Sequence, residues 1–334
     1  MNADFFQHKA TFLLYPSRKD VWRKKAIPIR ESIVNLANMI SSFEPVYLGY
    51  DIPITQTINE NVVPVKMQYN DVWIRDTGLI PVNNGGVNFL FNAWGGELYF
   101  DWEKDLTVAS KMAEILKVPY SKCDLTLEGG NLATDGNGTL IAIKPTICGT
   151  NRNPQFSIQQ IEERLRKILD IQNIIWLPEG LQYDETGGHV DNLCAFADSH
   201  SIFLAWTDDL NNPQYNIVRK AFEILSSAKN VNGDKFNIIK IPLPTIFTRS
   251  EDDCDGLEYN TNSKERLLGE KIQPSYINFV FVNGGVIVPQ FEDKNDKKVL
   301  KIFEDFFLNS KVLPFAAREI VLGGGGIHCL TKNF

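Results

Sequence analysis

Residues 125–142 have the sequence Leu-Thr-Leu-Glu-Gly-Gly-Asn-Leu-Ala-Thr-Asp-Gly-Asn-Gly-Thr-Leu-Ile-Ala. Strand-forming residues lead through Asp135-Gly136 into a second apolar run, and Asp-Gly between two such runs is a strong signal for a β-hairpin. Four other segments are rich in strand-forming residues, and most of them contain a similar Gly or Asn turn. They are residues 71–91, 187–206, 276–289 and 319–331. The sequence therefore predicts a hairpin motif that occurs five times.

Amphipathic stretches lie between these hairpins. In residues 157–170, Ile161 and Leu165 recur at helical spacing and charged residues occupy the opposite face. Pro154 and Ser157 supply a start signal for this helix. Similar patterns cover residues 19–42, 105–118, 211–228 and 295–308. A hairpin and a helix repeated about five times predict an α/β repeat architecture whose modules share a core.

The chain shows no low-complexity linker. One polar landmark stands in each repeat: Asp76, Glu128, His189, Asn278 and Cys329, at intervals of 52, 61, 89 and 51 residues. The longest interval contains the polar, loop-like residues 250–257. We therefore expect one catalytic domain over residues 1–334, with an insertion in this interval.

The composition is that of an ordinary globular protein. The 334 residues are 43% hydrophobic and 22% charged, with a net charge of −7. The acidic balance argues against a nucleic-acid partner and suits a small cationic substrate. No apolar run approaches the roughly 18 residues of a membrane span, and the first residues lack a signal-peptide pattern. We expect a cytoplasmic protein without membrane contact, and the sequence leaves open whether it forms a homo-oligomer.

Cysteine and histidine are too scattered to indicate a metal site. Five cysteines without a secretory signal are expected to be reduced, and no Cys-x-x-Cys pair occurs. His328 and Cys329 are adjacent, and the strand expected over residues 327–331 would point them to opposite faces. The sequence therefore does not predict a metal site.

Four glycines, residues 323–326, precede Cys329. Glycine lets another molecule approach the backbone closely. A phosphate cradle would open a helix, whereas only eight residues follow this run. The segment by itself fits either a reactive thiol or a buried structural cysteine.

Ionisable residues at corresponding places in other repeats favour the reactive thiol. Asp76 and Glu128 lie beside Gly-rich turns, and an expected strand would turn His189 and Asp191 into the same cavity. Two carboxylates in one pocket repel each other unless a cation lies between them, and a planar guanidinium matches carboxylates bidentately. With a thiol nucleophile and a histidine acid/base, the set is suited to attack on a guanidinium carbon.

At these residues the chain resembles the agmatine deiminase/bacterial-type peptidylarginine deiminase family of guanidino-modifying enzymes. The matching motifs are residues 70–78, 92–96, 128–131, 151–154, 184–191, 276–279, 283–290 and 324–329. The resemblance implies an α/β pentein fold, in which five ββαβ-type modules form a five-bladed propeller with pseudo-fivefold symmetry.

The resemblance also implies roles for individual residues. Cys329 corresponds to the nucleophile, His189 to the general acid/base, and Glu128 to the acid that partners the histidine. Asp76 and Asp191 correspond to the guanidinium-binding carboxylates. Glu185 and Trp94 are candidates for contact with the distal amine and the methylene stem of the substrate.

The activity implied is cofactor-independent hydrolysis of agmatine to N-carbamoylputrescine and ammonia, through a covalent cysteine thiouronium, in putrescine and polyamine metabolism. Arginine, methylated arginine or peptidyl-arginine are alternative substrates. A non-catalytic pentein scaffold would be expected to lack Cys329 or His189. Two departures from the family pattern, Leu79 and the Lys332-Asn333 pair, leave the non-reacting end of the substrate open.

Overall fold

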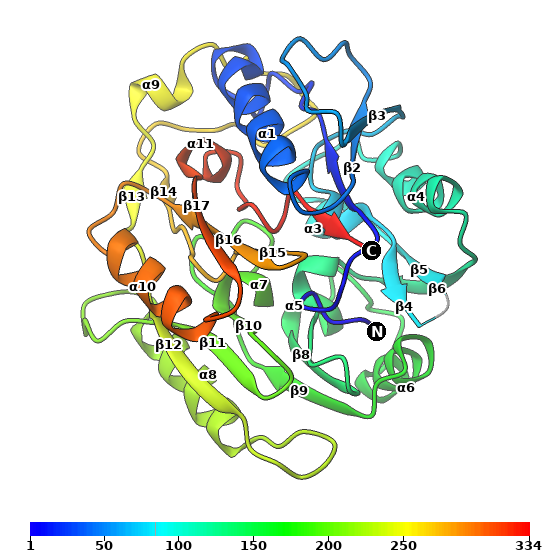
Figure 1. Cartoon of the computed structure of the whole chain (residues 1–334), viewed down its shortest axis with the longest axis vertical. Helices are drawn as coiled ribbons and strands as arrows, with labels where there is room; N and C mark the ends of the chain where they lie inside the picture. Colours follow the sequence, from blue (N-terminus) through cyan, green and yellow to red (C-terminus); the bar gives the residue numbers. More distant parts are fainter. Residues whose placement is uncertain (84) are drawn as a thin grey trace.

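The structure is a computed structural model that describes residues 1–83 and 85–334. Five sheets of three or four strands follow one another along the chain, with helices between their strands, and Figure 1 shows them arranged in sequence order around the molecule. The α/β prediction is confirmed. The strands in the described ranges form separate sheets and no closed one.

Each sheet takes its strands from neighbouring parts of the chain, except that the first also includes the last strand. The strands are β18 (Lys332–Asn333), β1 (Thr11–Leu14), β2 (Val46–Tyr50) and β3 (Val62–Lys66); β4 (Ile80–Val82), β5 (Gly85–Leu90) and β6 (Tyr120–Thr126); β7 (Ala133–Thr134), β8 (Thr139–Ile143) and β9 (Asn173–Leu177); β10 (Cys194–Phe196), β11 (Ser201–Trp206) and β12 (Asn237–Pro242); β15 (Val280–Val282), β16 (Gly285–Gln290) and β17 (Lys311–Ala316). A separate pair, β13 (Phe247–Thr248) and β14 (Lys271–Ile272), flanks the predicted insertion.

The strands of the four three-stranded sheets are connected in the same way. An antiparallel pair is followed by a helix, and the next strand pairs in parallel with the second member of that pair, as in β7-β8-β9. Four of the five predicted hairpins are therefore confirmed: β4-β5, β7-β8, β10-β11 and β15-β16. Residue 84, in the predicted turn of the first of these, lies outside the described residues.

The fifth predicted hairpin, residues 319–331, is wrong. Its first part is the helix α11 (Arg318–Val321), and residues 327–330 form turns instead of a strand. Gly324 adopts a φ of +103°, which a side chain would strain, and Thr331 N–H donates to His328 O at 3.1 Å. The chain therefore coils through this segment before β18 pairs with β1.

The predicted helices are confirmed with shorter bounds, one in each module. They are α1 (Ile27–Ile40) after the 3₁₀ turn η1 (Lys24–Ala26), α4 (Val108–Leu116) after η2 (Asp105–Thr107), α6 (Ile158–Leu169), α8 (Tyr215–Ser227) and α10 (Asp296–Phe306). In α6, the Ser157 hydroxyl accepts from Gln160 N–H at 3.3 Å while the Gln160 side chain accepts from Ser157 N–H at 2.9 Å. This capping box fixes where the helix begins.

One-turn helices precede three of the hairpins, and these carry the candidate site residues. Asp76 lies in α2 (Ile74–Thr77), Glu128 precedes η3 (Gly129–Asn131), and His189 precedes α7 (Val190–Leu193). Helix η3 contacts both α2 and α7. The remaining short helices are α3 (Ala93–Gly96), α5 (Pro145–Cys148) and α9 (Glu251–Cys254).

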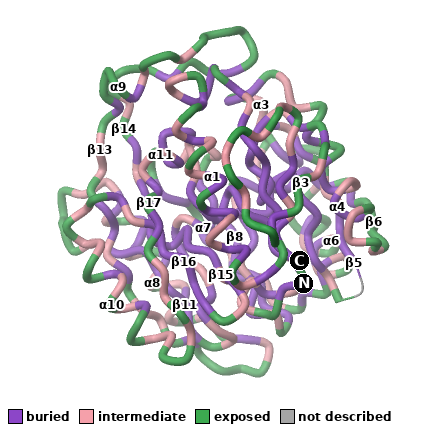
Figure 2. Tube along the Cα trace, turned by 45° about the horizontal axis from the view of Figure 1, so that its top comes forward, coloured by how far each residue is buried: buried purple, intermediate pink, exposed green. Residues whose placement is uncertain are grey.

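Buried residues gather in the middle of the molecule and exposed loops lie around its edge (Figure 2). One hydrophobic cluster includes residues from Phe12 to Leu330, and a second lies around α6. The short helices therefore hold their polar side chains within an apolar interior. Of the described helices, none has the length and apolar character needed to cross a membrane.

Candidate active site

The short helices bring three predicted site residues to one glycine. A methyl group placed on Gly130 would lie 2.7 Å from His189 Nδ1, 2.8 Å from Asp76 Oδ1 and 3.1 Å from Asp191 Oδ2. These distances are too short for a Cβ atom, so glycine is required here for steric reasons. The strand expected at His189 and Asp191 is wrong, because His189 caps α7 and Asp191 lies in its first turn. The helical turn nevertheless brings both side chains to Gly130.

Asp76 is held in place by two hydrogen bonds. Gly130 N–H donates to Oδ1 at 2.7 Å and Trp94 Nε1–H donates to Oδ2 at 2.9 Å. Burial raises the pKa of Asp76; His189 opposes this shift, whereas the charges of Asp191 and Glu128 add to it. A cation that entered beside this carboxylate would relieve that electrostatic penalty.

His189 lies between two carboxylates. Its Nδ1 is 3.8 Å from Asp76 Oδ1 and its Nε2 is 3.8 Å from Glu128 Oε2, too far for hydrogen bonds but close enough for ion pairing. Burial alone would lower the pKa of His189, but Asp76 and Glu128 outweigh burial and raise it to about 9. The imidazole is therefore poised to carry a proton.

Glu128 is oriented by a buried arginine. Arg152 Nε–H donates to Glu128 Oε1 at 2.5 Å and its Nη2 donates to Thr186 O at 3.0 Å. Glu128 Oε2 has no hydrogen-bond partner within the described ranges and lies on the side of His189. Asp184 fixes the backbone of His189 by accepting from its N–H at 3.0 Å.

Cys329 completes the group. Its Sγ accepts from Asn278 Nδ2 at 3.2 Å and lies 3.6 Å from Asp191 Oδ2, with 6% of the residue exposed. Asn278 Oδ1 also accepts from His328 N–H at 2.9 Å, which fixes the turn that carries the cysteine. Burial raises the pKa of Cys329 well above its usual value, and the charges of Asp191 and Asp76 add to this. The neutral thiol is therefore the resting form.

The expectation that His328 and Cys329 point to opposite faces is wrong. His328 Nδ1 lies 2.9 Å and Cys329 Sγ 3.6 Å from the same oxygen of Asp191. The reason is that residues 327–330 form turns, so the alternation of a strand does not apply.

A cavity, here called the central cavity, extends from these groups. Asp76 and Cys329 line one end, and Trp94, Tyr99 and Glu185 line the rest together with neighbouring residues. The Trp94 and Tyr99 rings meet edge to face at 5.3 Å, and Tyr99 O–H donates to buried Asp71 at 2.6 Å. Trp94 is thus both a packed aromatic residue and a wall of the cavity.

Glu185 has a partner that the sequence did not indicate. Its carboxylate accepts from Arg266, which is buried and also donates to Gly323 O at 3.0 Å. The charge of Glu185 is therefore largely compensated. Arg266 connects the loop that carries Glu185 to the glycine run before Cys329.

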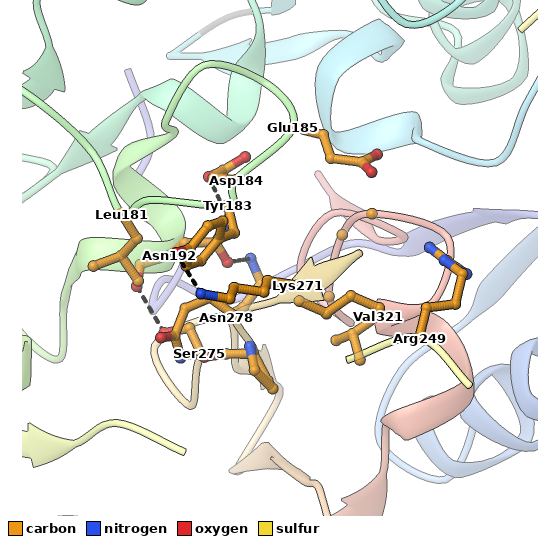
Figure 3. A pocket seen from close by; sticks show the side chains of 16 residues that line it. Leu181, Tyr183, Asp184, Glu185, Asn192, Arg249, Lys271, Ser275, Asn278 and Val321 are labelled. Atoms are coloured by element: carbon orange, nitrogen blue, oxygen red, sulfur yellow. Dashed lines mark hydrogen bonds between the residues drawn. The ribbon is translucent and has the colours of Figure 1, made fainter. Parts of the chain in front are cut away.

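A second cavity, here called the outer cavity, shares Glu185, Asn192 and residues 324–325 with the central one. Figure 3 shows its lining side chains, among them Lys271 and Arg249. Arg249 is buried and donates to Leu322 O at 3.0 Å, and burial together with Arg266 lowers its pKa. Positive charge therefore lies close to the end of the central cavity that Glu185 occupies.

All seven predicted site residues thus lie at or beside the central cavity. Sequence reasoning missed the roles of four other residues: Asn278, Arg152, Arg266 and His328. Asn278 and Arg152 belong to the matched motifs, and their side chains could have been examined there. Arg266 lies outside every motif, so no pattern pointed to it.

Comparisons with known proteins agree with this geometry. The chain matches the family of Porphyromonas-type peptidyl-arginine deiminases over residues 1–334. It is 38% identical to an agmatine deiminase of Ectopseudomonas mendocina, covering 100% of this chain and 94% of that protein. Among solved structures, the agmatine deiminase of Enterococcus faecalis superposes with a TM-score of 0.95 at 31% identity, covering 100% of this chain and 94% of that one. An agmatine deiminase of C. jejuni with substrate bound gives 0.85 at 28% identity, covering 99% and 94%.

Proposed function

This chain belongs to the family of Porphyromonas-type peptidyl-arginine deiminases, and we propose that it is an agmatine deiminase. The reaction is hydrolysis of agmatine to N-carbamoylputrescine and ammonia, with cleavage of a C–N bond in a linear amidine. The proposal is carried by one observation: a buried cysteine, a histidine and two aspartates lie close together beside an ion-paired glutamate, and Asp76 and Cys329 of this group line the central cavity.

The guanidinium of the substrate binds between Asp76 and Asp191. A planar cation offsets the mutual repulsion of the two carboxylates and offers each of them N–H donors. Asp191 Oδ1 is buried and has no partner among the described residues, so an acceptor is available. The bound cation also lowers the cost of forming a thiolate at Cys329, whose pKa in the free enzyme is raised by burial and these same aspartates.

When the cation binds, Cys329 loses its proton to solvent, and in the first step the resulting thiolate attacks the guanidinium carbon and forms a C–S bond. The tetrahedral adduct collapses as His189 gives its proton to the departing amino group, so ammonia leaves and a covalent thiouronium remains. His189 is suited to this step because its pKa of about 9 keeps it protonated at neutral pH.

In the second step the now neutral His189 accepts a proton from water, which attacks the thiouronium carbon. Collapse of this adduct breaks the C–S bond, expels the thiolate and leaves a ureido group on the product. Clamping the substrate between two fixed carboxylates orients the carbon for both attacks, which contributes much of the rate enhancement.

The distal part of agmatine lies along Trp94 towards Glu185. The indole face suits the methylene stem, and the Glu185 carboxylate accepts from the terminal ammonium while it stays paired with Arg266. Because Arg266 compensates part of this charge, amine recognition depends on the carboxylate oxygen that faces the cavity.

The same resemblance supports finer proposals about the whole protein. The four-stranded first sheet and the four three-stranded sheets are the blades of a pentein propeller with pseudo-fivefold symmetry, and residues 1–334 form one catalytic domain. The protein acts in the cytoplasm on a small guanidino substrate without metal, organic cofactor or nucleic acid, as a monomer or a homo-oligomer.

A ureido-product assay with agmatine, free arginine and a blocked arginine peptide tests the proposal. We expect agmatine to be preferred over arginine by at least about 100-fold in kcat/KM, or roughly 2.7 kcal/mol. Arginine is the second candidate substrate because Arg266, Arg249 and Lys271 near the distal end offer partners for a carboxylate. Equal turnover of arginine would overturn the substrate assignment, and absence of any ureido product would overturn the deiminase chemistry.

A further inference from the structure

The imidazole of His328, the residue before the proposed nucleophile, lies between two carboxylates. Its Nδ1 is 2.9 Å from Asp191 Oδ2 and its Nε2 is 2.8 Å from Asp4 Oδ2. The contact with Asp191 is buried, whereas the contact with Asp4, whose side chain is 31% exposed, is partly buried. The proposed mechanism does not use this histidine.

We propose that Asp4 and His328 are positioning residues, and that the Asp4–His328–Asp191 relay holds the Asp191 carboxylate towards the substrate guanidinium with His328 protonated. This inference rests on the proposed function and names the groups that keep one of its binding carboxylates in place.

Asp191 uses its two oxygens differently. Oδ2 accepts from His328, whereas Oδ1 is buried and has no partner in the part of the chain that the structure describes. A buried carboxylate oxygen without a donor is costly unless a ligand supplies one. His328 prevents the carboxylate from turning this oxygen away and so leaves it for the substrate.

The charge of His328 follows from its partners. Ionised carboxylates only accept hydrogen bonds, so both contacts of the ring become hydrogen bonds when each of its nitrogens carries a proton. The neighbouring charged or titratable groups are Arg75, Lys332 and the Cys329 thiol. Burial opposes ionisation of Asp4, but Arg75, which donates to it at 3.1 Å, and His328 hold its pKa well below the usual value.

The segment that carries Asp4 is itself fixed. Asp4 O accepts from His8 Nε2 at 2.7 Å, the amino group of Met1 donates to Leu169 O at 2.5 Å, and Lys9 N–H donates to Phe334 O at 2.6 Å. Residues before the first strand are therefore part of the support of the site.

Nitrogen-15 NMR of histidine-labelled enzyme tests the charge of the relay without any mutation in it. The chain has only four histidines, so their ring signals can be assigned by single substitutions. We expect both ring nitrogens of His328 to be protonated at pH 7, and one of them to lose its proton in Asp4→Asn. A neutral His328 in the wild-type protein would overturn the proposal, whether or not agmatine is a substrate.

Kinetics of His328→Gln and Asp4→Asn test the positioning. We expect each to lower kcat/KM for agmatine by roughly 10- to 100-fold, the worth of a charge-assisted hydrogen bond. The matched control is Asp135→Asn, which changes a buried carboxylate that accepts from the backbone of Asn137 and Thr139 at 2.8 and 2.9 Å, outside the relay.

The control should keep wild-type kcat/KM, and Asp4→Asn should keep the fold, as judged by circular dichroism. If folded Asp4→Asn retained kcat/KM within about threefold, the relay would not position Asp191 and the proposal would be wrong. If His328→Gln failed to fold, the Asp4→Asn kinetics and the NMR result would still decide it. A wild-type enzyme inactive on agmatine would refute the proposed function, and the NMR result would remain a separate measurement.

Discussion

The two ends of the central cavity differ in how their charged groups are held. At the reacting end, Asp76, Glu128, His189, Asp191 and Cys329 are all buried, and fixed donors or ion pairs surround them. At the distal end, the Glu185 side chain is 24% exposed, is paired with Arg266, and borders the outer cavity with its cationic residues. The reacting end therefore holds buried carboxylates with fixed partners, whereas the distal end holds one partly exposed carboxylate paired with an arginine.

This difference predicts which end of the central cavity controls the rate of the chemical step and which end controls the choice of substrate. Carboxylates fixed in a water-poor site act strongly on a cation and on a developing thiolate, so chemistry should depend steeply on the reacting end. A compensated and partly exposed glutamate interacts weakly with an ammonium group. Its contribution to the preference between substrates should therefore be smaller, in free energy, than the contributions of the reacting-end carboxylates to the chemical step. Substitutions at the two ends should therefore differ in magnitude and in what they change.

The largest expected effect is that of Cys329→Ala, which should reduce agmatine turnover to background because no covalent intermediate can form. Cys148→Ser and Cys123→Ser should retain activity, since neither thiol lines the central cavity. The ureido assay measures all three variants. Retained activity in Cys329→Ala would contradict the assignment of the nucleophile.

Next come Asp76→Asn and Asp191→Asn, each of which removes one charge from the guanidinium clamp. We expect each to lower kcat/KM by at least about 100-fold with little change in the preference for agmatine over arginine, because both substrates present the same guanidinium. Steady-state kinetics with both substrates would check this. Near wild-type kinetics for both variants would reduce these aspartates to a structural role.

Glu128→Gln should act through the pH dependence. The productive form holds one proton, on His189, and a thiolate at Cys329. Below the His189 pKa of about 9 the free enzyme has a protonated His189 and a neutral Cys329 thiol, which is one proton more than the productive form. The value of kcat/KM should therefore rise as the pH increases towards about 9. Removing the Glu128 charge destabilises the imidazolium, lowers this pKa and moves the rising limb to lower pH. An unchanged limb in the kcat/KM profile would show that Glu128 does not act on His189.

The smallest effect is expected at the distal end. Glu185→Gln should weaken agmatine use more than arginine use and shrink their kcat/KM ratio by about 10-fold, while the rate of the chemical step stays close to wild type. Arg266→Lys is the matched variant, because it keeps the positive charge beside Glu185 but loses the planar guanidinium that orients the Glu185 carboxylate. If the rate of the chemical step fell as far in Glu185→Gln as in Asp76→Asn, the proposed difference between the two ends would be wrong.

The sequence predicted which side chains come together at the reacting end, because glycine turns, strand-forming runs and the polar residues beside them recur along the chain. It failed where local geometry depends on distant partners. Residues 327–331 have strand propensity, yet Asn278, about 50 positions away, fixes them as turns by accepting from the His328 N–H. Arg266 and Asp4 reach the site from a loop and from the chain start, and no local pattern records such contacts.

Mass spectrometry of the enzyme quenched with acid during turnover of agmatine tests the central claim most directly. We predict that part of the protein gains the mass of agmatine less one ammonia, and that fragmentation places this adduct on Cys329. Turnover without any adduct in Glu128→Gln or wild-type enzyme, or an adduct confined to another cysteine, would contradict the covalent mechanism and the role assigned to the reacting end.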